Sequence, residues 1–176
     1  MLLRRGPRRR GAAEAMSARS ELADRAQIND ILVRYAEGLD RRDLDAVRSC
    51  FAPGVQAEYG GVVLDPGVDA LVGHVSIVST FVGSMHLLGN VIVEIDGDTA
   101  HSTCRCVAYV LRDTPDGVRL FMRGLTYEDR WSRLDAGFRI TDRRHVPEWS
   151  MEAPVEVFTA SFAVVPKTLH SSEEMD

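Results

Sequence analysis

From residue 84 onward, the chain consists of long runs typical of β-strands, separated by short turn motifs. The turns contain Asp96-Gly97-Asp98, Pro115-Asp116-Gly117 and Asp135-Ala136-Gly137. Tight turns of this composition join neighbouring antiparallel strands. We therefore predict an antiparallel meander, formed by the runs SMHLLGNVIVEI, TAHSTCRCVAYVLRD, VRLFMRGLTYEDRWSRL and FRITDRRHV.

The residues before the meander have the apolar spacing of helices. The segment from Glu21 to Leu39 is predicted to be helical, because its apolar residues recur every three or four positions and form one stripe. A shorter second helix would begin after Asp43 as its N-cap and end at Pro53-Gly54. The first stripe consists of Ile28, Ile31, Leu32, Tyr35 and Leu39, and the second helix would bury Leu44, Val47 and Phe51.

A strand and a third helix are predicted between these helices and the meander. The segment VQAEY at 55–59 has the composition of a strand, and Gly60-Gly61 after it that of a turn. Asp65-Pro66 has the pattern of an N-cap followed by proline at the first helical position. The helix that follows would bury Val68, Leu71, Val72 and Val75.

Helices first and a meander second predict the α+β fold class. We expect the helices within residues 21–80 to pack on one face of a strongly curved antiparallel sheet made from residues 55–64 and 84–149. A bent sheet folded over a long helix leaves a cone-shaped cavity, and small-molecule sites favour such concave surfaces.

Length and charge set the broad class of protein. The chain has 176 residues, enough for one domain with a sizeable core. Its net charge of −5 argues against a nucleic-acid partner, and no run is long and apolar enough to indicate a membrane span. We expect residues 1–20 to be a disordered Arg-rich extension, residues 21–165 the domain, and residues 166–176 a polar C-terminal tail.

The arginine-rich start has alternative interpretations. The first ten residues hold five arginines and no acid, which also suits a transit peptide or a nucleic-acid-binding arm. Translation starting at Met16 would remove most of this segment. Gly6, Pro7 and Gly11 oppose a helix here.

Three cysteines, an odd number, without a recognisable signal peptide indicate reduced thiols and a cytoplasmic location. Cys104 and Cys106 would lie on one face of a strand. They could be a metal or redox pair, but we favour two small buried hydrophobic residues.

Common catalytic and nucleotide-binding motifs are absent from the sequence. Polar residues in otherwise apolar elements are the remaining candidates for a site. His86 stands out, because a buried imidazole needs a hydrogen-bond partner and disfavours its charged form. Structural alternatives exist for the other candidates: a core or sheet-edge tyrosine, a capping aspartate and a solvated arginine. The candidates are Tyr35, Asp40, Tyr59, His86 and Arg105.

Three segments together resemble the SnoaL-like group of the NTF2-like superfamily. They are INDILVRYAEGLDRRDLDAVRSCFAPGVQAEY, SMHLLGNVIVEIDGDTAHS and YEDRWSRLDAGFRITDRR, and they span about residues 22–149. The resemblance implies a cone-shaped α+β fold. In this superfamily the cavity serves dehydratases, isomerases, cyclases, hydrolases and non-catalytic binders, so the fold alone leaves the reaction open.

The site is similar to those of the bile-acid dehydratase and scytalone dehydratase types. Their pattern has a tyrosine and an aspartate near the end of the first helix, a tyrosine on the first strand and a histidine on the strand after the third helix. This chain departs from them at Val107, near the second histidine of scytalone dehydratase, and at Ala108, in place of an acid. The late arginine of the bile-acid type has no secure counterpart. The matching residues are Tyr35, Asp40, Tyr59 and His86.

The resemblance assigns roles to these four residues. His86 is expected to act as general base and then acid, with Asp40 as its orienting carboxylate. Tyr59 and Tyr35 are expected to donate hydrogen bonds to substrate oxygens. No metal or organic cofactor is expected. The residues expected to contact the substrate are Arg105, Val107 and Leu88.

The function expected is that of a cofactor-independent lyase (a dehydratase) or an isomerase or cyclase. It would act by general acid–base catalysis on a hydrophobic ring-bearing hydroxy-ketone or polyketide-like molecule. The alternative is a non-catalytic small-molecule binder or accessory protein. A third possibility is an epoxide hydrolase, whose Asp–Arg–Asp set around a water has no clear position in this sequence. A homo-oligomer, dimer or trimer, is expected, because the outer face of such a sheet is a common dimer surface in the superfamily.

Overall fold

The computed structural model describes the backbone of residues 8–155 and the side chains of residues 20–155. Part of the predicted extension, residues 1–7, and the predicted tail, residues 166–176, lie outside the described residues. The helices are α1 (Arg8–Arg41), α2 (Leu44–Ser49), α3 (Val68–Val75) and the 3-10 helix η1 (Ser76–Thr80). The strands are β1 (Phe51–Tyr59), β2 (Val62–Val63), β3 (Gly83–Asp96), β4 (Thr99–Thr114), β5 (Gly117–Leu134) and β6 (Gly137–Pro154).

The predicted meander is confirmed. Strands β3 to β6 pair antiparallel with their neighbours in chain order, within one sheet of order β2-β1-β6-β5-β4-β3. One pairing differs from the prediction, because β1 runs parallel to β6, with Tyr59 opposite His145. The sheet is therefore mixed. The parallel pair arises because the chain passes through the whole meander before returning beside β1.

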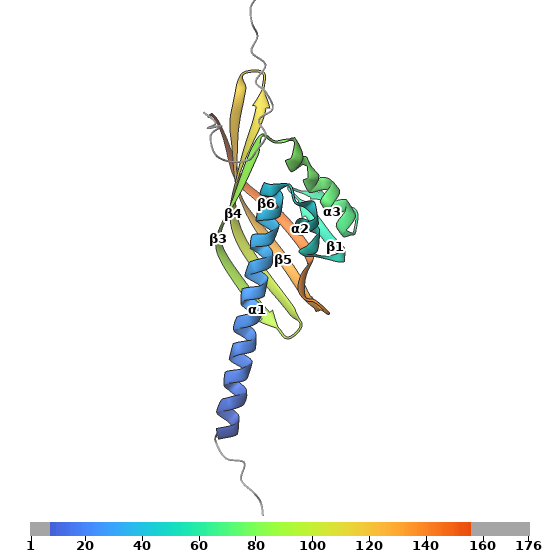
Figure 1. The fold of residues 1–176 in the computed structure, drawn as a ribbon, viewed down its shortest axis with the longest axis vertical. Coiled ribbons are helices and arrows are strands. Elements are labelled where there is room, and N and C mark those ends of the chain that lie inside the picture. The colour runs from blue at the N-terminus through green and yellow to red at the C-terminus, as the bar shows by residue number, and fades with distance from the viewer. Residues whose placement is uncertain (1–7, 156–176) are drawn as a thin grey trace, which may run out of the picture.

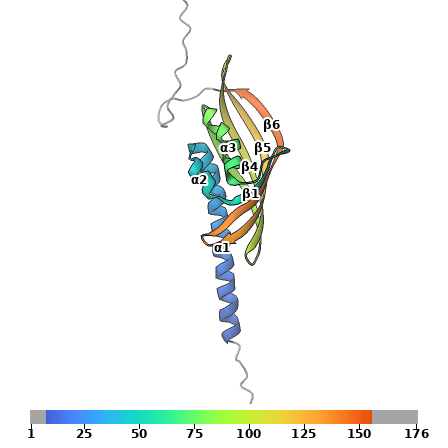
Figure 2. The ribbon, with the colours of Figure 1, turned by 90° about the vertical axis from the view of Figure 1, so that its right-hand side faces the viewer.

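The helices cover one face of the curved sheet, as the α+β prediction requires. Figure 2 shows α1, α2 and α3 on the same side of the strands. Figure 1 shows α1 lying along the sheet, with its N-terminal half extending beyond it. The predicted apolar stripe of α1 faces the core. Its members are Ile28, Ile31, Leu32, Tyr35 and Leu39, each at most 3% exposed.

The two first helices approach each other closely at a glycine. A Cβ atom at Gly38 would lie 2.9 Å from Val47 Cγ2, so only glycine allows α2 to pack this tightly on α1. Asp43 is the N-cap of α2, as predicted, and accepts a hydrogen bond from the backbone N–H of Ala46 at 2.9 Å. This packing fixes the end of α1, where Asp40 lies.

The start of α1 differs from the prediction. The helix begins at Arg8, so the backbone of residues 8–20 is helical where composition indicated a disordered extension. Extending an existing helix adds a hydrogen bond for each residue without a new nucleation step. The alanines of this segment, Ala12, Ala13 and Ala15, have the highest helix propensity and offset Gly11.

Two other element boundaries also differ. The second helix ends at Ser49, and Phe51 and Pro53-Gly54 belong to β1. The β1–β6 register shifts between Phe51 and Gln56, where proline has no ladder hydrogen bond to donate. Gly67, not Asp65, is the N-cap of α3. Its N–H donates to the Val55 carbonyl at 2.9 Å and holds the connecting loop on β1 until the helix begins.

Within the described residues, no helix combines the length and the apolar character needed to cross a membrane.

Candidate active site

His86 lies on the face of β3 that is turned toward the helices. Its neighbours Met85 and Leu87 are each 56% exposed on the opposite face. The His86 side chain is only 8% exposed. Because side chains alternate along a strand, this histidine points into the cone. The sequence-based expectation that His86 faces inward from its strand agrees with this placement, and its role at a cavity stays a prediction.

Asp40 and His86 form two direct hydrogen bonds. Asp40 Oδ1 lies 2.7 Å from His86 Nδ1, and Asp40 Oδ2 accepts the backbone N–H of His86 at 2.7 Å. Ser84 donates its hydroxyl to Asp40 Oδ1 at 2.8 Å. The carboxylate is thus bound on both oxygens and cannot rotate freely. The imidazole is held through Nδ1, so Nε2 remains available for proton transfer.

The end of α1 is fastened to β3 by Arg42. This residue has a φ of 59°, in the left-handed region, and follows the last residue of the helix. Its guanidinium donates to the Asp40 carbonyl and to Phe81 O, the latter at 3.3 Å. It also lies 3.4 Å from Ser84 Oγ. These contacts hold Asp40 in place by binding its backbone and its hydrogen-bond partner.

The electrostatics of the pair favour an ionised Asp40. Burial by itself would raise the pKa of this carboxyl, but the hydrogen bonds and charge of His86, with the Ser84 hydroxyl, outweigh it. The pKa of Asp40 is therefore lowered below its ordinary value. An ionised carboxylate fixes the imidazole tautomer with a proton on Nδ1 and stabilises the imidazolium formed when Nε2 takes up a proton.

Tyr35 and Tyr59 are also brought together. Their hydroxyl oxygens lie 2.9 Å apart. Burial raises the pKa of both phenols well above the usual value, so both stay protonated. Tyr35 is 1% exposed, and Tyr59 is partly buried at the core boundary. Of the two, Tyr59 is therefore the one placed to touch a ligand, with Tyr35 behind it.

A buried ion pair supports these tyrosines, and the sequence analysis missed it. Arg143 and Asp129 are both 0% exposed at their side chains and form two hydrogen bonds, of 2.7 and 2.6 Å. Burial disfavours the charged guanidinium, but the Asp129 carboxylate more than compensates and raises the pKa of Arg143. The guanidinium carbon lies 4.2 Å from the ring centroid of Tyr35 and 4.4 Å from that of Tyr127. Arg143 is thus an arginine on the last strand that borders the candidate site. The resemblance to the bile-acid dehydratase type had given no secure counterpart for that type's late arginine.

His145 is a second histidine of the interior that the sequence analysis did not single out. Its ring stacks on Tyr59, with centroids 5.2 Å apart and an interplanar angle of 18°. Its Nδ1 is buried and has no hydrogen-bond partner among the described residues. Burial, with the nearby charges of Arg123, Arg143 and His86, lowers the pKa of His145 to about 4. The imidazole is therefore neutral at physiological pH.

A hollow of about 600 Å³ opens beside Tyr59 and His145. Arg123 and Trp149 also border it. The Trp149 indole lies over Gly124, where an added Cβ would come within 2.1 Å of the ring. Glycine at this position is therefore what seats the indole at the edge of the hollow.

Two of the three residues expected to contact the substrate do not face the interior. Cys106 and Ala108 point inward from β4 and are at most 7% exposed, so alternation turns Arg105 and Val107 to the outer face. Arg105 pairs there with Glu148 at 3.0 Å. The prediction that Arg105 and Val107 bind substrate is corrected accordingly. Leu88 is partly buried against the core and faces the same way as His86.

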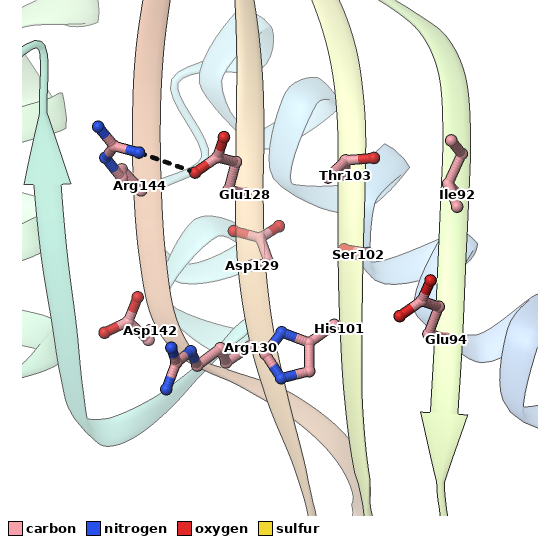
Figure 3. A pocket seen from close by; sticks show the side chains of 10 residues that line it. All are labelled: Ile92, Glu94, His101, Ser102, Thr103, Glu128, Asp129, Arg130, Asp142 and Arg144. Carbon is pink, nitrogen blue, oxygen red and sulfur yellow. Dashed lines mark hydrogen bonds and ion pairs between the residues drawn. The ribbon is translucent and has the colours of Figure 1, made fainter.

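A second hollow of about 600 Å³ lies on the outer face of the sheet. Figure 3 shows His101, Glu128 and Arg130 in front of the strands, with the helices behind. Charged residues dominate it, including an ion pair of Arg144 with Glu128 at 3.1 Å. It contains none of the four residues with predicted catalytic roles, whereas the hollow beside His145 contains Tyr59.

The cysteines are buried free thiols. Cys104 is 0% and Cys106 3% exposed, as expected for small core residues. Burial raises the pKa of Cys104 to about 11 and that of Cys106 to about 12, so neither is a thiolate at neutral pH. Among the residues that the structure describes, no three His, Cys, Asp or Glu side chains converge as metal ligands.

Comparison with known proteins agrees with the architecture. A family model described as a SnoaL-like domain matches residues 20–144, most of the chain. The chain belongs to the SnoaL-like family. An uncharacterized protein of Mycobacterium tuberculosis is 29% identical to this SnoaL-like chain over 134 residues, which cover 73% of the chain and 88% of the relative. A protein of Mycobacterium bovis matches to the same extent.

Solved structures share the fold of this SnoaL-like chain at low sequence identity. A proposed scytalone dehydratase of Novosphingobium aromaticivorans superposes with a TM-score of 0.70 at 15% identity, covering 79% of this chain and 93% of that one. A hexachlorocyclohexane dehydrochlorinase of Novosphingobium barchaimii gives a TM-score of 0.67 at 17% identity, covering 80% and 97%. These similarities establish the NTF2-like fold. They do not identify the reaction, which is inferred from the residues of the site.

Proposed function

We propose that this protein is a cofactor-independent lyase of the dehydratase type, acting on a hydrophobic ring-bearing hydroxy-ketone. The observation that carries the proposal is the Asp40–His86 pair inside the cone. A histidine held by a carboxylate through Nδ1, with Nε2 left free to take up a proton, can act as a general base. Dehydratase and dehydrochlorinase neighbours of the same fold agree with an elimination reaction.

The proposed reaction needs one base that becomes an acid. His86 Nε2 removes a proton from the carbon next to the substrate carbonyl, and Asp40 stabilises the resulting imidazolium. The same proton then goes to the departing hydroxyl, which leaves as water while the carbon–carbon double bond forms. Tyr59 donates a hydrogen bond to the carbonyl oxygen as it gains negative charge. Tyr35 holds the Tyr59 hydroxyl in position from behind.

The rival functions would make different demands on the same site. A non-catalytic binder would use the cone without needing the Asp40–His86 pair. An epoxide hydrolase would need carboxylates around a water, and Asp129 is fully buried and bound to Arg143. The oligomer expected from the sequence remains a proposal. Met85, Leu87 and Ile92, all more than half exposed on the outer face of β3, would be covered by a second copy.

The experiment uses a bicyclic β-hydroxyketone of the hydroxytetralone type. Its dehydration gives a naphthol, whose fluorescence reports product directly. In D₂O, mass spectrometry of the remaining substrate also detects exchange of the proton next to the carbonyl. Turnover by the wild type and its loss in His86→Gln support the proposal. Binding of the compound without dehydration or exchange favours the binder.

A further inference from the structure

The strongest unassigned feature is a cationic group at the mouth of the cone. Arg123 lies on β5, on the same face as the buried Leu125 and Tyr127, and borders the 600 Å³ hollow. Among the side chains of residues 20–155, no carboxylate forms an ion pair with it. An arginine facing a cavity without a carboxylate partner is a ready site for an anion, since its planar guanidinium can bind one through two parallel hydrogen bonds.

The surroundings of Arg123 leave its positive charge without a neutralising partner among the described residues. The hollow is also bordered by His74 and by His145, whose imidazole is neutral. The acid at its edge, Glu148, is engaged elsewhere: it accepts from Thr126 at 2.6 Å and from Arg105 at 3.0 Å on the outer face. Arg123 is therefore the charged group at this opening that has no ion-pair partner among residues 20–155.

The sheet register places Arg123 in line with the catalytic histidine. His86 is opposite Ala108 on β4, and Ala108 is opposite Arg123 on β5. Strands in a sheet are about 4.8 Å apart, so the backbones of His86 and Arg123 are separated by about 10 Å. Ser150, which also borders the hollow, is the partner of Arg123 on β6. This separation is comparable to the length of a bicyclic molecule that carries an acidic substituent.

We propose that the substrate of this site carries an anionic group, most simply a carboxylate, which Arg123 binds at the mouth of the cone. The inference rests on the proposed function, since it places the reacting carbon of the same molecule at His86. The ring system of the substrate lies along Tyr59 and His145. Its anionic group lies against Arg123, with the Ser150 hydroxyl as a further hydrogen-bond donor. The substrate class is therefore an acidic, ring-bearing hydroxy-ketone.

The test compares naphthalene carboxylate with its neutral carboxamide, two probes of the same shape that differ in charge. Binding is measured by calorimetry or by the fluorescence of Trp149, which borders the hollow. The wild type is expected to prefer the carboxylate by about tenfold or more, because hydrogen bonds to charged groups contribute more than neutral ones. Raising the salt concentration should reduce that preference.

Arg123→Gln is expected to abolish the preference, and Arg123→Lys to restore part of it. Arg130→Gln is the matched control, because Arg130 lies on the same strand but borders the outer hollow. Equal binding of the two probes by the wild type, or an unchanged preference in Arg123→Gln, overturns the inference. His86→Gln should lose dehydration and keep the carboxylate preference. An intact preference without any dehydration by the wild type overturns the lyase proposal and not the anion site.

Discussion

Asp40 binds His86 through both the ring and the backbone, with Oδ1 2.7 Å from Nδ1 and Oδ2 2.7 Å from the amide nitrogen. One carboxylate thus positions the strand and orients the imidazole on it. This double contact makes the pair a single unit, in which each residue depends on the other for its geometry.

Removing the charge of Asp40 should therefore impair turnover much more than folding. Asp40→Asn is expected to lower the rate by about 10²–10⁴, the usual contribution of a general acid–base group. Combining it with His86→Ala should add little, because residues that act as one unit have non-additive effects. Steady-state kinetics of the hydroxytetralone reaction measures both. Asp43→Asn is the control, since asparagine also caps a helix; a similar rate loss there would contradict a specific role for Asp40.

The buried Arg143–Asp129 pair should make single substitutions costly for stability. Arg143→Met leaves an unpaired carboxylate at a fully buried position, and we expect the free energy of unfolding to fall by about 3–5 kcal/mol. Urea denaturation followed by circular dichroism measures the change. The double variant Arg143→Met with Asp129→Leu should be more stable than the single variant, because it removes the buried charge as well. If the free energy of unfolding of Arg143→Met falls by less than about 1 kcal/mol, the ion pair is accessible to water and the prediction is wrong.

His145 should make stability depend on pH in a defined window. Its pKa is about 4 in the folded protein and about 6.5 in the unfolded chain. The unfolded chain therefore binds more protons between these values, so the stability contributed above pH 6.5 is lost as the pH falls toward 4. We expect a loss of about 2–3 kcal/mol for this residue. Urea titrations at pH 7, 5.5 and 4.5 should show a steeper decline for the wild type than for His145→Phe, and equal slopes would refute this assignment.

Gly124 should not tolerate a side chain while Trp149 stays in place. A Cβ there would lie 2.1 Å from the indole, so Gly124→Ala must displace the ring. We expect a loss of about 1–3 kcal/mol, typical of overpacking, and a change in Trp149 fluorescence. Gly54→Ala is the control, because nothing lies within 4 Å of its added Cβ. Adding Trp149→Ala to Gly124→Ala should recover part of the loss, and an unchanged melting temperature in Gly124→Ala alone would contradict the packing.

Local signals in the sequence were sufficient for the meander and for the inward side chain of His86, whereas the family resemblance supplied Asp40 as its partner. Turn residues separated the strands, and an isolated histidine in an apolar strand indicated an inward side chain. The same alternation that puts Cys104 and Cys106 inside also puts Arg105 and Val107 outside, so their expected contact with substrate was inconsistent with the predicted strand. Alternation along β4 alone would have corrected it.

The remainder of the site depends on contacts that no local pattern encodes. Asp129 and Arg143 are buried because each neutralises the other across two strands, and either one alone has the appearance of a solvated residue. The register shift between Arg130 and Trp131 also breaks the regular alternation with β6. His145 therefore could not be placed inside by counting from Ile140.

The parallel pairing of β1 with β6 has a consequence for how the chain is synthesised. Strand β1 leaves the ribosome early, but its hydrogen-bonding partner is the last strand of the meander. The Asp40–His86 contact spans only 46 residues and can form while the rest of the chain is still being made. The Tyr59 ring can stack on His145 only after β6, the final strand, has been synthesised. Folding is thus completed at the C-terminal side, and contacts over such long sequence separations are slow to form.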